Sequence, residues 1–278
     1  MFEQIRHRVF EFVIGLALVA TPSAVGQVIT SVTFSGSDGP ISGGIEAQRE
    51  NSLGGMVVPF GEDVFTFTDR THQYNGPRFT AAGTLTFADA PAVSDVTVGL
   101  PGYLLGAEYV STLNGNRDNA AFQLLVGLTQ LRPATAYLLI DNRVGDASNT
   151  NPPALGAGGL GVMPWVADDG WKIVNTGLSP NGQPDFVGID EGRTPSNFAD
   201  RIANGTNQGT GPGVLVNNAY TLFAKTFSAG STITLKAQND GTDDNMYGLV
   251  VVPEPSVMGL CGCALLAVAG NHRRRRAI

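Results

Sequence analysis

The sequence has almost no cysteine or histidine away from its ends. Its two cysteines, Cys261 and Cys263, lie near the C-terminus, so residues 27–251 contain neither a disulfide nor a thiol nucleophile. His72 is the only histidine in that region. One histidine without cysteine cannot build a zinc site unless carboxylates join it, and a Ser-His-Asp triad would depend on His72 alone. We therefore predict no catalytic residue and a non-enzymatic protein.

Basic residues are also scarce in the middle of the chain. Eleven of the 17 lysines and arginines, but 22 of the 24 acidic residues, lie outside the first 26 residues and the C-terminal arginine cluster. An acidic surface repels phosphate groups, so a nucleic-acid partner is not expected. The same surface is compatible with divalent cations.

The N-terminus has the three parts of a secretory signal peptide. A basic Arg6-His7-Arg8 segment precedes a mostly apolar stretch, residues 9–20, and small residues follow it. The small residues Ala24 and Gly26 predict cleavage between Gly26 and Gln27. We therefore predict a signal peptide over residues 1–26 and export of the rest.

Long apolar runs are absent until the C-terminus. From Ser256 to Gly270 all fifteen residues are apolar or small, which is fewer than the ~20 that usually span a bilayer. The run is preceded by Pro253-Glu254-Pro255, where the prolines interrupt regular structure, and is followed by four arginines, Arg273, Arg274, Arg275 and Arg276. Arginines can reach the headgroups and mark the cytoplasmic side, so we predict a transmembrane helix with its C-terminus inside. We interpret Cys261 and Cys263 as small apolar residues of that helix.

This tail, residues 252–278, resembles the PEP-CTERM sorting signal. Pro253-Glu254-Pro255, the apolar helix and the arginine cluster occur in that order at the end of the chain. The resemblance implies a membrane processing enzyme of the exosortase type as partner, transient anchoring in the inner membrane, and then a place at the cell surface or in the extracellular matrix. It also implies an association with exopolysaccharide and biofilm.

The middle of the chain favours strands. Abundant glycine, threonine, valine and asparagine, with alternating apolar and polar residues, predict about ten short strands separated by Asn-Gly and Asp-Gly turns. The expected strands are 28–34, 65–68, 85–87, 93–100, 103–113, 122–128, 137–140, 220–227, 232–237 and 246–252. We predict an all-β body over residues 27–251, an antiparallel β-sandwich of jelly-roll type. It resembles, more loosely than the tail does, the β-sandwich bodies of other PEP-CTERM proteins.

One turn is rich in oxygen ligands. The segment from Asn239 to Asn245 contains Asp240, Asp243 and Asp244, and Ca²⁺ takes six to eight oxygen ligands in irregular loops. The spacing is not that of an EF-hand, and Asp and Asn are also common turn residues. The segment is therefore either an ordinary turn or a calcium site formed by these three aspartates.

Two tryptophans give a second candidate site. Trp165 and Trp171 flank Asp168-Asp169, and exposed tryptophans beside polar groups bind sugars, although burial is the commoner fate of tryptophan. An alternative function is a carbohydrate-binding module, with calcium or without it, motivated by the two tryptophans and by the turn around Asp240. A glycoside hydrolase or lyase is a further alternative, since paired carboxylates are present, but neighbouring residues on a strand point to opposite faces.

Overall fold

The computed structural model describes residues 27–36, 57–62, 64–67, 72–87, 92–190, 216–240 and 244–254. The predicted signal peptide, Pro255, the apolar helix and the four arginines lie outside these residues. No helix among the described residues is long and apolar enough to cross a membrane.

The body is built from antiparallel sheets, which confirms the all-β prediction. A three-stranded sheet has the order β1-β7-β12, with β1 at Ile29–Ser35, β7 at Gln123–Leu128 and β12 at Thr232–Lys236. Buried and more exposed residues alternate along β7 and β12, which is the period of two that the sequence displays. Every pair of strands in the described part of the chain is antiparallel.

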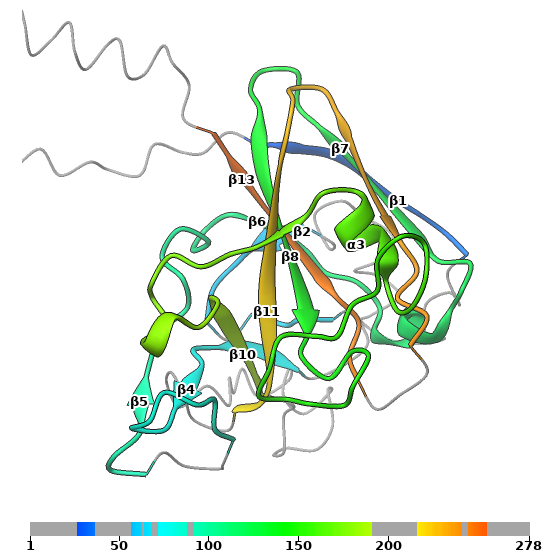
Figure 1. Ribbon diagram of the computed structural model, residues 1–278. Helices are drawn as coiled ribbons and strands as arrows, with labels where there is room; N and C mark the ends of the chain where they lie inside the picture. Colours follow the sequence, from blue (N-terminus) through cyan, green and yellow to red (C-terminus); the bar gives the residue numbers. More distant parts are fainter. Residues whose placement is uncertain are drawn as a thin grey trace, which may run out of the picture.

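The larger sheet has eight strands, in the order β2-β6-β13-β8-β11-β10-β3, with β9 paired to β11. Their bounds are β2 Val57–Pro59, β6 Glu108–Val110, β13 Gly248–Pro253, β8 Ala134–Asp141, β11 Val216–Phe227, β10 Phe186–Asp190, β3 Gln73–Asn75 and β9 Lys172–Ile173. Figure 1 shows β13, β8 and β11 crossing the middle of the molecule, with β1 and β7 on the right. A small two-stranded sheet joins β4 (Arg78–Phe79) to β5 (Val96–Thr97).

The two larger sheets share one hydrophobic core. Leu124 and Ile233 of the smaller sheet belong to the same buried cluster as Leu138, Leu222 and Val250 of the larger one. Burial of apolar side chains supplies the main stabilising free energy of such a fold, roughly 25 cal/mol per Å² removed from water. A second small cluster, formed by Phe79, Leu85, Phe186 and Ala219, lies around β4 and β10.

Two predicted strands are wrong. Residues 65, 67 and 85 form only isolated bridges. Between the first two, the carbonyl of Thr66 accepts the hydroxyls of Tyr109 and Ser111 instead of a neighbouring strand's amide. Conversely, β10 was not predicted, since all five of its residues are buried and show no alternation.

Helices are few in the described part of the chain. A short helix, α3, covers Pro164–Asp168, and two 3-10 turns cover Asn114–Asp118 (η1) and Pro180–Gly182 (η2). Proline is favourable at the first position of a helix, where its missing N–H is not needed. α3 matters for the sites below because it carries Trp165.

Candidate functional site

The predicted sorting motif begins inside the sheet. β13 continues through Val252 to Pro253, which pairs with Ala134 of β8. The N–H of Glu254 donates to the carbonyl of Pro133 at 3.0 Å, and its carboxylate accepts the hydroxyl of Thr135. β13 thus ends at Pro253, and its last two residues, Val252 and Pro253, belong to the predicted tail. A proline is tolerated as the last residue of the strand because no neighbour needs its N–H there.

The start of the predicted mature chain lies near the same end of β13. Gln27 is exposed, whereas Val28 and Ile29 are buried, and their N–H groups donate to the two carboxylate oxygens of Glu108 at 2.8 and 2.6 Å. Glu108 belongs to β6 and lies opposite Val251 of β13. Glu108 thus connects the two ends of the body: its carboxylate binds the first residues, and its backbone pairs with the last strand.

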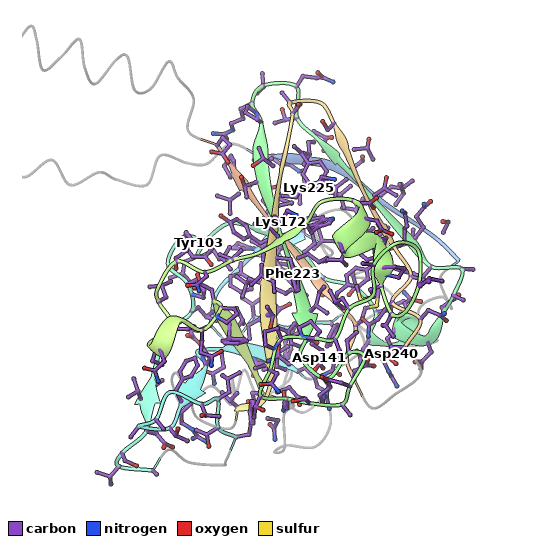
Figure 2. The ribbon with its side chains drawn as sticks, viewed as in Figure 1. Tyr103, Asp141, Lys172, Phe223, Lys225 and Asp240 are labelled. Carbon is purple, nitrogen blue, oxygen red and sulfur yellow. The ribbon has the colours of Figure 1, made fainter. Side chains whose placement is uncertain are left out.

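The aspartates of the predicted calcium turn lie in a buried polar cluster. Asp240 is 8% exposed and Asp244 is 3% exposed, while Asp243 lies outside the described residues. Asp141, at the end of β8, faces the same region (Figure 2), and its Oδ2 accepts the N–H of Asn245 at 2.9 Å. Sequence reasoning missed Asp141 because it lies about a hundred residues before the turn. The polar run Asp141-Asn142-Arg143 directly after an apolar strand was the available signal.

The three carboxylates have different environments. Asp141 accepts four hydrogen bonds: from the N–H, Nε and Nη2 of Arg143 at 3.0, 3.1 and 2.7 Å, and from Asn245. Asp240 accepts the N–H of Gly145 at 2.7 Å. Neither carboxylate oxygen of Asp244 has a hydrogen-bond partner among the described residues, and the Nε of Arg117 is 4.0 Å from its Oδ1. Asp244 is therefore the least stabilised anion of the cluster.

This environment changes the acidity of Asp244. Burial raises its pKa to about 7 from an ordinary value of 3.8, and the carboxylates of Asp240 and Asp141 add to the rise. Across the described residues, no three side chains of His, Cys, Asp or Glu come together in a way that could hold a metal ion. The calcium site built from Asp240, Asp243 and Asp244 thus stays a prediction.

We expect this pKa to make stability depend on pH. Between about pH 4 and pH 7 the folded state holds the Asp244 proton and the unfolded state does not, so the free energy of unfolding falls as the pH rises through this window. The Asp244→Asn variant has no carboxyl group at this position, so its free energy of unfolding lacks the part that depends on the Asp244 proton. Urea unfolding from about pH 4 to pH 8 in chelator-containing buffer should show a smaller pH-dependent fall for the variant. Parallel pH curves for the two proteins would contradict the expectation.

The tryptophan site is not supported. Trp165 is 5% exposed and Trp171 is 4% exposed. The indole Nε1 of Trp165 donates to the carbonyl of Ala237 at 3.0 Å, and its ring meets Tyr247 edge-on with centroids 5.9 Å apart. Trp171 packs against Phe227. The prediction of ligand contact through these two rings is therefore wrong, because neither presents a flat face to solvent.

A pocket of about 400 Å³ opens where β12 ends. Its lining includes Gln123 of β7, Lys236, Asn239 and, beside α3, Met163. Asn239 and Met163 both have left-handed backbones, with φ of 51° and 43°. Asparagine accepts this conformation readily, whereas methionine does so at a cost. Asn239 directly precedes Asp240, so the pocket borders the buried acidic cluster.

The acidic pairs that could serve a hydrolase do not act as pairs. Asp168 accepts the N–H groups of Gly158 and Gly159 at 2.7 and 2.8 Å, whereas the Oδ2 of Asp169 is 3.3 Å from the Nζ of Lys236. These neighbouring carboxylates thus serve separate structural contacts.

Two further acidic pairs of the sequence, Asp190-Glu191 and Asp243-Asp244, each have one member outside the described residues. Asp190 is buried, and its neighbour Glu191 lies outside the described residues. His72, the only histidine of the body, is half-buried and packs edge-on against Phe67. Comparisons with protein-family models, with curated proteins and with solved structures found no match.

Proposed function

We propose that this is an exported, non-enzymatic protein of the cell surface or extracellular matrix, sorted through its PEP-CTERM-like tail. The observation that carries the proposal is the order of segments in the sequence: a signal peptide, an acidic body, Pro253-Glu254-Pro255, an apolar stretch and four arginines. An exosortase-type enzyme in the inner membrane is the proposed processing partner. Surface polysaccharide is the proposed destination.

The body suits a structural role of this kind. Its antiparallel sheets enclose one core, and the proposed finer classification is a jelly-roll-like sandwich. The end of β13 at Pro253 leaves no linker between the sheet and the motif, so the body would be held close to the membrane surface until the tail is processed. The carbohydrate-binding alternative rested on exposed tryptophans, and because both are buried we do not carry it further.

The tail proposal predicts a defect in processing. Replacing both prolines, Pro253→Ala with Pro255→Ala, should leave the full-length protein in the membrane fraction, whereas the wild type loses its tail and leaves that fraction. Immunoblotting of membrane and released fractions, with mass spectrometry of the mature C-terminus, measures this. Unchanged size and location of the double variant would contradict the proposal.

A matched control separates sorting from folding, since Pro253 also ends β13. Pro133→Ala changes an exposed proline next to the motif but keeps the carbonyl that receives the Glu254 N–H. This variant should be processed like the wild type. If Pro133→Ala showed a processing defect of equal size, the defect of the double variant would come from a disturbed end of the sheet and not from the loss of the motif.

A further inference from the structure

Asp244 is an unusual buried carboxylate. Its side chain is fully buried, and both of its oxygens are without a hydrogen-bond partner in the described part of the chain. Buried carboxylates normally accept several hydrogen bonds or pair with a cation, as Asp141 does with Arg143 and Asn245. Asp244 therefore has unused capacity to bind a positive group.

Arg117 provides that group only at the limit of an ion-pair distance. Arg143 is committed to Asp141 through two side-chain hydrogen bonds. The guanidinium of Arg117 donates to the carbonyl of Asn114 at 3.3 Å and also faces Asp118, while its Nε stays 4.0 Å from Asp244. Asp240 adds a second negative charge beside Asp244. The cluster thus carries more negative than positive charge.

We propose that Asp240 and Asp244 together bind a divalent cation of the calcium type. Both oxygens of Asp244 would face the ion, and Asp240 would add its carboxylate, whose Oδ2 also accepts the Gly145 N–H. Water and backbone carbonyls complete such a shell in other calcium sites. The ligands on this side are oxygen atoms of acidic side chains, with no sulfur or imidazole, which is the chemistry of Ca²⁺ rather than of zinc or copper.

The place in the fold supports this choice. Asp240 follows β12 of the smaller sheet and Asp244 precedes β13 of the larger sheet, so one ion would join the two layers. Calcium tolerates the irregular geometry of such a connection, whereas Mg²⁺ demands a near-ideal octahedron.

Calcium titration of the full-length protein in detergent tests this site. After treatment with a chelator, Ca²⁺ should raise the unfolding temperature at about pH 8, and the apparent affinity should fall at about pH 5.5, because protons compete with Ca²⁺ for carboxylate ligands. Asp244→Asn should remove the calcium response. Asp240→Asn is the second variant and should weaken calcium binding at least tenfold.

The matched control is Asp118→Asn, since Asp118 is an exposed carboxylate beside the same arginine. It should keep the wild-type response to Ca²⁺, and Mg²⁺ should act more weakly than Ca²⁺ on both proteins. The proposal is overturned if Ca²⁺ leaves the wild type unchanged at about pH 8, which would make Asp244 a proton site only. It is also overturned if Asp244→Asn responds as strongly as the wild type, which would indicate general screening of the acidic surface.

Discussion

Replacing Trp165 with alanine should lower the free energy of unfolding by about 3–5 kcal/mol, because a large buried ring is lost and a cavity remains. The ring is 5% exposed, packs against Tyr247 and bonds Ala237, so it links α3 to the ends of both β12 and β13. In a domain of this size each kcal/mol shifts the unfolding temperature by about 2–4 °C. Circular dichroism measures the shift without depending on tryptophan fluorescence.

Two further variants locate the source of that loss. Trp165→Phe keeps an aromatic ring but cannot donate to Ala237, so it should cost less than the alanine variant. Leu160→Ala, in the loop before α3, removes apolar atoms from a side chain that is 77% exposed and should change stability by no more than about 0.5 kcal/mol. If Trp165→Ala were as stable as Leu160→Ala, the ring would not be part of the core.

Replacing Asp141 with alanine should cost about 3 kcal/mol, since it breaks a buried ion pair and leaves buried donors unpaired. Arg143 loses two side-chain hydrogen bonds, and the N–H of the buried Asn245 loses its acceptor. Urea unfolding at constant pH measures the difference.

The control for this variant is Asp146→Ala, an exposed aspartate five residues further along the same connection. It should cost less than about 1 kcal/mol, because its carboxylate only accepts the nearby Ser148 N–H. A double-mutant cycle with Arg143→Ala isolates the coupling between Asp141 and Arg143. A coupling energy near zero would show that the loss comes from the backbone N–H groups of Arg143 and Asn245, which Arg143→Ala leaves in place.

The strands with alternating residues were the predictable part of the fold. β7 and β12 have one face in the core, so their sequences carry the period of two, and their approximate bounds follow from it. β10 and most of β13 are buried on both faces, which removes the alternation. Strand order cannot be deduced this way, because β13 lies between β6 and β8, more than a hundred residues earlier in the chain.

The candidate sites were also predictable only in part, namely where their residues are neighbours in the sequence. The cluster of aspartates between Asn239 and Asn245 is visible in the sequence because its members are neighbours. Its partners Asp141 and Arg117 come from other parts of the chain, so neither the burial of Asp244 nor its raised pKa could be foreseen. Trp165 and Trp171 show the opposite case: their residue types suited sugar binding, and only the packing reveals that they are buried.

The position of β13 has a consequence for the order of events during synthesis and export. It is the last strand of the body to leave the ribosome or a translocation channel, yet it joins β6 to β8 in the interior of the larger sheet. Until residues 248–253 have emerged, β6 lacks the strand that joins it to β8 in the described part of that sheet. The larger sheet can therefore form completely only after nearly the whole chain has emerged. A truncation before β13 would remove an interior strand of that sheet and not an edge strand.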